Sequence, residues 1–357
     1  KIESLKRGER TECIWVDQLK DERRKLPRVK KPRVFNMAPL DHQLAWKKFF
    51  GDFVDMVVEK RMELGVMVGI DASGPEWTRL LEKLKSKSRN GLAGDYGLFD
   101  ITQFADLMQD LMTVINTWYD DGPENALARH TLCDEMLHAV HLCGNTMFVS
   151  HLGMKSGWFL TAIVNSLMNL LYMAIAYLII TRYPEKFQIQ NVPVGYDNLS
   201  TYDSLVWWAT YGDDNLGGIS ELIENFYNGE NIQKVFKYYG LEYTPADKSS
   251  TFGPNQPLEE LTFLKRGFLE SPVLGKYLSP IDKITIQELT NWTRENPDME
   301  LLFEQNIMDS LRFAFHHGED YYEEHLTRVN DALFEHRFEP ISLPWKSLYR
   351  EWISKFY

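Results

Sequence analysis

The sequence predicts an α+β fold with a helical C-terminal part. Apolar residues recur at helical spacing after residue 284 and over four earlier segments: 42–64, 76–88, 101–117 and 219–239. Strand-like apolar runs lie between them at 65–70, 91–100, 142–152 and 204–218. Strands and helices therefore mix without the regular alternation of an α/β protein.

The composition indicates a globular chain with more than one substructure. It has 357 residues, of which 44% are hydrophobic and 25% charged, enough for a sizeable core. The cysteines Cys13, Cys133 and Cys143 are odd in number and widely spaced, so we expect free thiols in a reducing compartment. The sequence starts at Lys1, without Met and without an apolar signal segment, so we expect a processed product or a fragment.

The first unusual segment is basic. Between Lys20 and Arg33 there are eight Lys or Arg residues against Asp21 and Glu22, a net charge of +6 in a chain whose total is −12. Phosphate binding needs local rather than total positive charge. Two prolines inside the segment favour strand or loop over helix. Phosphate contact is one interpretation, and a solvated basic loop is the other.

The longest apolar segment carries a polar stripe. Residues 158–180 contain no charged side chain, and roughly 20 such residues suffice to cross a bilayer. However, Thr161, Asn165 and Asn169 are spaced by four and so lie on one face of a helix. We therefore expect a buried core helix that turns this face toward a site, with a membrane span as the alternative.

Two adjacent aspartates end the apolar run in "WWATYGDDNLGG". Gly212 allows a tight turn, and Asp213 and Asp214 stand at the tip of a predicted hairpin. Like charges so close raise the pKa of at least one carboxyl unless a cation lies between them, and Mg²⁺ prefers carboxylate oxygens. We expect a metal site here, with a surface turn as the alternative.

A third carboxylate would complete a site for two Mg²⁺ ions, and two segments offer one. Asp95 follows one strand-like run, with Asp100 five residues later; Asp71 follows another, with Glu76 five residues later. Local pattern barely separates them. Ser73 and Glu76 have the spacing of a capping box at a helix start, which gives Asp71 a structural setting that Asp95 lacks.

Two further segments are informative only in combination. In "GMKSGWFLTAIVN" (153–165), Gly153, Ser156 and Gly157 form a flexible entry to the polar-striped helix, where backbone can approach a ligand closely; an ordinary loop is the alternative. "YTPADKS" (243–249) places Lys248 after a proline turn, which by itself indicates a surface turn.

Taken in order, these segments resemble six motifs of the RNA-dependent RNA polymerases of picornaviruses and picorna-like viruses. The basic segment is similar to motif F, "DYGLFD" to motif A, "GMKSGWFLTAIVN" to motif B, "YGDD" to motif C, "YTPADKS" to motif D and "FLKR" to motif E. The likeness continues through "FHHGEDYY" and "LPWKSLYREWISKFY" and covers essentially the whole chain. Dicistroviruses and iflaviruses are the groups that it resembles most.

The resemblance implies a right-hand polymerase with fingers, a palm of antiparallel sheet plus helices, and a helical thumb. It selects Asp95 over Asp71. It assigns 1–50 and 132–155 to the fingers, 51–131 and 156–269 to the palm, and 270–357 to the thumb. This chain departs from the family pattern in two ways. The family carries a further N-terminal segment with the index finger, so we expect a truncated chain. Motif F is also shorter here, which leaves open which family positions Lys30 and Lys31 correspond to.

The resemblance also implies an activity: template-directed nucleotidyl transfer that replicates a positive-strand viral RNA genome by a two-metal mechanism. Asp95, Asp213 and Asp214 would bind two Mg²⁺ ions, for which Mn²⁺ substitutes, and Lys248 would be a general acid toward pyrophosphate. The other expected site residues form two sets. Those for the nucleoside triphosphate (NTP) are Lys20, Arg24, Arg28, Arg33, Asp100, Ser156, Thr161 and Asn165, and those for RNA are Gly157, Lys265 and Arg266.

The partners implied are an RNA template and primer, NTPs, a protein primer peptide and other viral replication proteins. The implied location is the host cytoplasm, in membrane-associated replication complexes, for a chain without a transmembrane segment of its own. A reverse transcriptase-like polymerase is the nearest alternative, but it typically has a bulky residue where Asp100 and Asn165 are polar. An inactive RNA-binding polymerase fragment is the alternative of another class.

Overall fold

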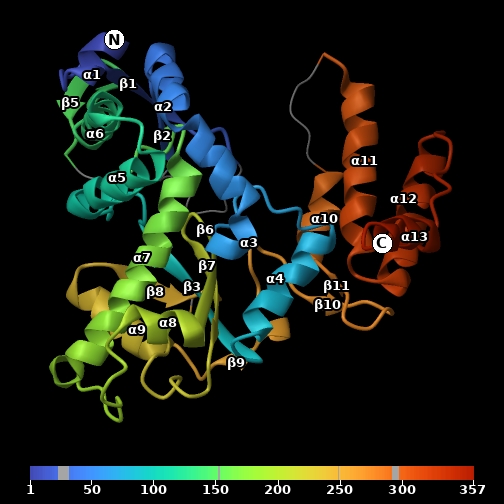
Figure 1. The fold of residues 1–357 in the computed structure, drawn as a ribbon. Helices are drawn as coiled ribbons and strands as arrows, with labels where there is room; N and C mark the ends of the chain where they lie inside the picture. Colours follow the sequence, from blue (N-terminus) through green and yellow to red (C-terminus); the bar gives the residue numbers. More distant parts are fainter. Residues whose placement is uncertain (23–31, 152, 248, 292–296) are drawn as a thin grey trace.

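The computed structural model describes residues 1–22, 32–151, 153–247, 249–291 and 297–357. It has an N-terminal sheet with helices, a central antiparallel sheet flanked by helices, and a C-terminal group of helices. In Figure 1 the N-terminal elements (blue) and the C-terminal helices (red) lie on opposite sides of the molecule, with the central sheet below the N-terminal elements. Helices and strands mix as predicted, so the α+β class is confirmed.

The N-terminal sheet has the strand order β2-β1-β4-β5, in which β1 and β4 run parallel and the other neighbours antiparallel. Trp46 of the neighbouring helix α2 is fully buried and packs edge-on against Trp158, which precedes the long helix of the central part. That contact ties the two parts together. The elements are α1 Ile2–Lys6, β1 Ile14–Leu19, β2 Val34–Met37, α2 Leu40–Glu59, α5 Ala105–Tyr119, α6 Pro123–Leu137, β4 Val140–Cys143 and β5 Thr146–Val149.

The central sheet has the order β6-β7-β3-β8, and β9 also pairs with β3. Because alternate residues of a strand face opposite sides, Leu92 and Trp208 lie in the core beneath α7 and α9, whereas Ala93 and Leu216 lie in the core beneath α4. Both faces are therefore covered. The elements are α4 Pro75–Lys85, β3 Asn90–Gly97, α7 Thr161–Arg182, β6 Val206–Tyr211, β7 Asp214–Ile219, α9 Gly229–Tyr238, β8 Glu242–Pro245 and β9 Gln256–Pro257.

The helix α7 is the one described helix that is long and apolar enough to cross a membrane. It packs against α8 (Leu199–Leu205), α9 and β6, and 61% of its most apolar stretch is buried inside the fold. Asn165 and Asn169 of the polar stripe are buried as well. Such burial is typical of a core helix, and it supports that interpretation over a membrane span.

The C-terminal helices form a separate core around Trp345 and Trp352. The short β10–β11 hairpin connects them to α4, where Tyr277 N donates to Thr78 Oγ1 at 3.0 Å and Trp77 Nε1 donates to Gly267 O at 3.0 Å. The helix α4 therefore supports both the central sheet and the C-terminal part. The elements are β10 Leu269–Glu270, β11 Tyr277–Leu278, α10 Lys283–Leu289, α11 Met299–Phe315, α12 Glu319–Glu335 and α13 Trp345–Ser354.

The structure differs from the sequence expectation in several places. Residues 65–70 form no strand: Gly65 and Gly69 both have φ of +82° and interrupt the extended backbone, so only a single bridge from Val66 reaches the sheet. The helix expected from 219 begins ten residues later, at Gly229. The helix α6 was not expected, because its buried residues surround it and leave no single apolar stripe. The remaining short elements are α3 Arg61–Leu64, η2 Pro184–Phe187 and η3 Leu258–Glu260.

Candidate active site

Three carboxylates from two distant segments lie at one end of the central sheet. Gly94 on β3 pairs with Asn215 on β7, so Asp95 and Asp214 occupy the next register positions on the two strands. Asp213 is in the turn that joins β6 to β7. Strand register therefore places Asp95 beside the aspartate pair, although more than a hundred residues separate them in the chain.

One face of α7 holds the tip of this hairpin. Ser166 Oγ accepts a hydrogen bond from Gly212 N at 2.8 Å, and Asn169 Nδ2 donates to the backbone oxygens of Gly212 and Asp213 at 3.1 and 3.2 Å. Tyr96 OH, on β3, donates to Asn169 Oδ1 at 3.2 Å. Gly212 has φ of +62°, a left-handed conformation that glycine adopts without strain. The predicted stripe included Asn169 but missed Ser166, which no local signal distinguishes within an apolar helix.

Asn215 braces the same turn from the strand side. Its Nδ2 donates to Asp213 O at 3.2 Å, and its Oδ1 accepts from Gly94 N at 3.2 Å and from Tyr243 OH at 2.8 Å. A Cβ on Gly94 would lie 2.1 Å from the Tyr243 ring, so only glycine fits there. Sequence reasoning missed Asn215 and Tyr243; the position of Asn215 directly after the aspartate pair was the available signal.

A buried amide chain runs from the end of β3 into the core. Asn165 Nδ2 donates to Asp100 Oδ1 at 2.7 Å, Gln103 Nε2 donates to Asn165 Oδ1 at 3.3 Å, and Tyr172 OH donates to Gln103 Oε1 at 2.9 Å. Each partner determines the orientation of the next, so the Asn165 amide is held in one orientation. The structure thus brings Asp100 and Asn165 together, and it adds Gln103 and Tyr172, which the sequence reasoning missed.

The site is electrostatically crowded. The side chain of Asp213 remains accessible at the turn, but partial removal from water raises its pKa above the ordinary value, and the charges of Asp95 and Asp100 raise it further. The positive charge of Arg33 acts in the opposite direction. Carboxylates that repel one another in this way favour the binding of a cation between them.

The rival carboxylate Asp71 has a different setting. Its Oδ1 accepts from Ser73 N at 3.0 Å, its own N donates to Glu76 Oε2 at 2.7 Å, and Glu76 pairs with Arg61. The predicted cap by Ser73 is wrong: Gly74 is the N-cap of α4 and no side chain caps it, because Asp71 holds the Ser73 backbone in its own turn. The hydrogen bonds of Asp71 are therefore local, and its charge acts on the guanidinium of Arg266.

The 153–157 segment packs closely on the neighbouring backbone. Met154 N donates to Asp100 O at 2.6 Å, and a Cβ on Gly157 would lie 1.9 Å from Asn36 O. Thr161 Oγ1 donates back to Trp158 O at 2.8 Å. Ser156 Oγ is buried and, among the described residues, has no hydrogen-bond partner. A buried hydroxyl without a partner is a candidate contact for a ligand.

The expected basic residues are only partly described. Lys20 N donates to Arg33 O at 2.8 Å, and Arg33 Nη1 lies 3.4 Å from Glu22 Oε2. Arg33 is also close enough to lower the pKa of Asp213. Three other predicted site residues lie outside the described residues: Arg24, Arg28 and Lys248.

Lys265 and Arg266 differ in their surroundings. Lys265 is exposed, with φ of +59°. Arg266 Nη1 donates to Ser279 O at 3.0 Å, and the guanidinium lies 5.3 Å from the centroid of the Phe313 ring. Burial lowers the pKa of Arg266. Arg266 therefore anchors the start of the C-terminal part, and Lys265 is the more accessible of the two for RNA.

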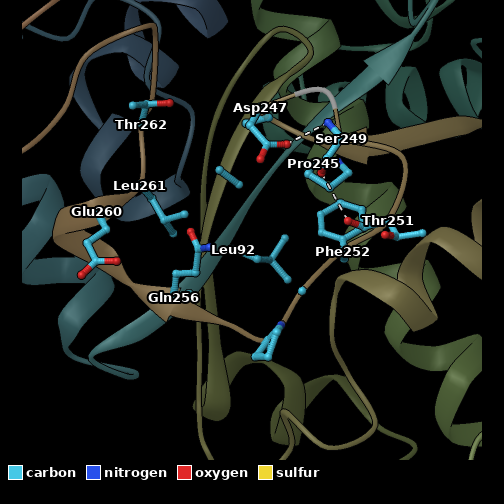
Figure 2. A pocket seen from close by; sticks show the side chains of 15 residues that line it. Leu92, Pro245, Asp247, Ser249, Thr251, Phe252, Gln256, Glu260, Leu261 and Thr262 are labelled. Carbon is cyan, nitrogen blue, oxygen red and sulfur yellow. Dashed lines mark hydrogen bonds between the residues drawn. The ribbon is translucent and has the colours of Figure 1, made fainter.

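A cavity of about 340 Å³ lies beside the central sheet. Figure 2 shows Asp247 and Ser249 on one side of it and Glu260 and Leu261 on the other, with Leu92 of β3 between them. Of the described residues, none of the three carboxylates at the end of the sheet lines it. The cavity is therefore distinct from the carboxylate site.

The carboxylates suit a hard divalent cation, although they form no closed cage. Among the described residues, no three His, Cys, Asp or Glu side chains are grouped closely enough to hold a metal ion by themselves. Mg²⁺ is usually bound by one or two carboxylates together with waters and substrate phosphates. The oxygen donors of Asp95, Asp213 and Asp214 and their mutual repulsion fit that mode of binding.

Residues 1–333 match the family model described as viral RNA-dependent RNA polymerase. The chain belongs to this family. The resemblance inferred from six motifs is therefore confirmed, and the carboxylates of β3 and of the β6–β7 hairpin lie in the part of the chain that matches.

Curated relatives are larger viral polyproteins. The chain is 33% identical over 356 residues to the genome polyprotein of Rice tungro spherical virus (strain Vt6), covering 98% of this chain and 10% of the relative. It is 29% identical over 333 residues to the replicase polyprotein of Drosophila C virus (strain EB), covering 90% of this chain and 18% of the relative. The chain thus spans less than a fifth of the length of these two relatives.

A solved structure, the Sicinivirus 3Dpol RNA dependent RNA polymerase, has the same fold. It superposes with a TM-score of 0.79 at 21% sequence identity and covers 99% of this chain and 70% of that one. The match confirms the predicted right-hand polymerase fold.

Proposed function

We propose that this polymerase-family chain adds nucleotides to the 3′ end of an RNA primer under the direction of an RNA template. The observation that carries the proposal is the convergence of Asp95 with Asp213 and Asp214 next to the Asp100–Asn165 pair. Crowded carboxylates suit divalent cations, and a fixed polar pair beside them suits a ribose hydroxyl.

In this proposal Asp95 and Asp213 are the main ligands of two Mg²⁺ or Mn²⁺ ions, and Asp214 supports them. Bound metal would activate the attacking 3′ hydroxyl and stabilise the oxygens of the leaving pyrophosphate. Ser166, Asn169 and Asn215 act as positioning residues, since their hydrogen bonds determine the course of the backbone that carries the carboxylates.

The sugar of the incoming NTP would be read by Asp100 and Asn165. Because Gln103 holds the Asn165 amide, Asn165 presents a defined donor to the 2′ hydroxyl, which distinguishes an NTP from a dNTP. Ser156 offers a buried hydroxyl for the same substrate. Thr161 is bonded to the backbone at the start of α7, so it would shape the pocket rather than contact the sugar through its hydroxyl.

The triphosphate and the RNA need positive charge. Arg33 is the described basic residue near the carboxylates; with it we assign Lys20, Arg24 and Arg28 to the triphosphate, because Arg suits bidentate phosphate contacts. Lys248 would donate a proton to pyrophosphate. Lys265, and Gly157 through its backbone, would contact RNA without reading its sequence.

The biological setting follows the family. Its membership implies a divalent metal, RNA and NTPs as ligands, and replication in the host cytoplasm. A protein primer peptide, other replication proteins and membrane-associated complexes are further parts of the proposal. So are the fingers, palm and thumb boundaries predicted from the sequence.

The test is extension of a primed RNA template by the purified chain. We expect product in Mg²⁺ or Mn²⁺ and none after chelation with EDTA, with activity restored by excess Mg²⁺. Binding of the primed RNA is measured in parallel by fluorescence anisotropy. RNA binding without any extension would instead identify an inactive RNA-binding fragment, and extension by a longer chain that includes the preceding polyprotein segment would show that the missing activity requires that segment.

A further inference from the structure

Two imidazole rings face each other at the base of the 153–157 segment. His138 ends α6, and His151 follows β5. Their Nδ1 atoms are 3.0 Å apart, and the ring centroids are 5.2 Å apart with the planes inclined by 55°. The His151 residue is exposed to solvent, and 36% of the His138 side chain is exposed. Both side chains are therefore in contact with solvent.

The distance between the two nitrogens is close to that of a chelating pair. Two imidazole nitrogens at 2.0–2.1 Å from a tetrahedral zinc ion are about 3.3 Å apart. Without metal, one Nδ1 carries a proton and the other accepts it in a hydrogen bond. A metal ion would replace that shared proton after the rings separate by a few tenths of an ångström and each ring turns so that its Nδ1 lone pair points at the ion.

A carboxylate beside the other ring nitrogen of His138 also favours metal binding through Nδ1. Asp134 Oδ1 lies 3.4 Å from His138 Nε2, and Arg10 Nε lies 3.4 Å from Asp134 Oδ2. Arg10 Nη2 also donates to His138 O at 2.8 Å. Metal-binding histidines usually donate their second ring N–H to a carboxylate, which leaves the other nitrogen free for the metal. Asp134 favours the proton on His138 Nε2 and so leaves Nδ1 as the ligand atom.

We propose that His138 and His151 bind one divalent transition-metal ion of the Zn²⁺ class, with water in the remaining positions. Imidazole nitrogens select Zn²⁺, Ni²⁺ or Cu²⁺, whereas Mg²⁺ requires oxygen ligands, so this site is chemically distinct from the carboxylate site. In the described part of the chain no third His, Cys, Asp or Glu completes the set. The affinity is therefore lower than that of a structural site with four protein ligands.

The ion would fasten the loop to α6. Lys155 Nζ already donates to Leu137 O at 3.3 Å and to Ser150 Oγ at 3.2 Å, the residues next to His138 and His151. A metal bridge beside this lysine would hold the base of the 153–157 segment more firmly. The effect would reach Ser156 and Gly157 through a short stretch of backbone.

The test is Zn²⁺ titration of the untagged chain by calorimetry, with Mg²⁺ present in excess. We expect one zinc per chain, lost in both His138→Gln and His151→Gln. The controls Cys143→Ser, which removes an exposed thiol, and His336→Gln, an exposed histidine on another part of the fold, should keep it. No binding, or binding that survives both histidine variants, would overturn the proposal, as would its loss in Cys143→Ser.

Thermal unfolding gives a second readout that separates misfolding from loss of the site. Each variant is melted with and without Zn²⁺, and the zinc-free curve shows that it folds. Zinc should raise the melting midpoint of the unaltered chain and of the two controls, because a ligand that binds only the folded state stabilises it. It should leave the midpoints of His138→Gln and His151→Gln unchanged; an equal rise in all five proteins contradicts the site.

Discussion

Asp71 and Asp95 occupy locally similar segments of this chain, yet the fold gives them opposite surroundings. Each follows an apolar run, and each has a second acid five residues later. Asp95 lies near the end of β3 in the middle of an antiparallel sheet, where its neighbours are the carboxylates of the β6–β7 hairpin. Asp71 is in a turn before α4, where its neighbours are the backbone of Ser73 and the Glu76 carboxylate that accepts its N–H.

The difference teaches that the partners of a carboxylate, rather than its local sequence, decide its chemistry. The hydrogen bonds that Asp71 itself makes reach no further than five residues along the chain and stabilise a turn. Around Asp213, the charges of Asp95 and Asp100 raise the pKa of a carboxyl far away in the sequence. The Asp71 carboxylate is stabilised by hydrogen bonds within its own turn. The carboxylates around Asp213 repel one another, and a bound cation would remove that repulsion.

The largest expected effect comes from making the same substitution, aspartate to asparagine, in each of the two regions. Asp95→Asn should reduce primer extension by about a thousandfold or more, because loss of a ligand to the catalytic metal removes several kcal/mol of transition-state stabilisation. Asp71→Asn should change the rate by less than about twofold, since its partners are local. Single-turnover extension rates measure both, with RNA affinity as the control. Comparable losses in the two variants would contradict the assignment of Asp95.

Gly94, which precedes Asp95, and Gly74, whose Cβ would meet the Asp71 carboxylate, provide a comparative test of packing. Gly94→Ala places a Cβ 2.1 Å from the buried Tyr243 ring, whereas Gly74→Ala places one 2.2 Å from the Asp71 carboxylate, which can move away. We expect Gly94→Ala to cost about 2–3 kcal/mol of unfolding free energy and Gly74→Ala less than about 1 kcal/mol. Urea unfolding measures both; equal costs would show that the sheet accommodates the extra methyl group.

Substitution of Asn165 affects selectivity rather than the metal. Asn165→Ala removes the amide that bonds Asp100 and, in our proposal, one hydrogen bond to the ribose. The preference for NTP over dNTP should fall about tenfold, the equivalent of one hydrogen bond of roughly 1.4 kcal/mol. Competitive incorporation of UTP and dUTP measures it. An unchanged preference would remove Asn165 from sugar recognition.

In the Asp71 region, we expect a loss of stability without a loss of rate. Glu76→Gln weakens the ion pair with Arg61 and the bond from Asp71 N, so it should lower the unfolding free energy by about 1 kcal/mol. Extension by the folded variant should match that of the unaltered chain. A slower single-turnover rate at unchanged stability would indicate that this turn also serves the catalytic site.

The smallest effect concerns the raised pKa of Asp213. As pH rises, the unfolded chain loses this proton first, so the folded state loses stability between the unfolded and folded pKa values and remains less stable above them. Asp213→Asn should therefore raise the melting midpoint slightly in metal-free buffer at neutral pH, and the two proteins should converge in acid. Mg²⁺ should stabilise the unaltered chain more than the variant. A lower midpoint for Asp213→Asn in metal-free buffer would show that the carboxylate is stabilised without metal.

The parts of the fold that were predictable are those whose pattern is local. Helical spacing located α2, α4 and α5, and the apolar run before the aspartate pair located β6 and its turn. The helix α6 was not predicted because nearly all of its sides are buried, which leaves no apolar stripe. The short strand β1 was not predicted because it is stabilised by pairing with the distant β4. Of the site, acids and amides in motif-like segments were predictable, but supports such as Ser166, Gln103 and Tyr243 were not.

The sequence by itself determined the family, the order of the six motifs and the identity of the paired aspartates, because these depend on residue types at short spacing. The order of the motifs also selected Asp95 over Asp71. Only the tertiary structure placed Asp95 beside the aspartate pair through strand register, showed Arg266 bonded to Ser279, and brought His138 next to His151. Each of these depends on strand register or on packing between segments far apart in the chain. The physical reason is that electrostatic and hydrogen-bonding partners are chosen by distance in space, which local spacing does not determine.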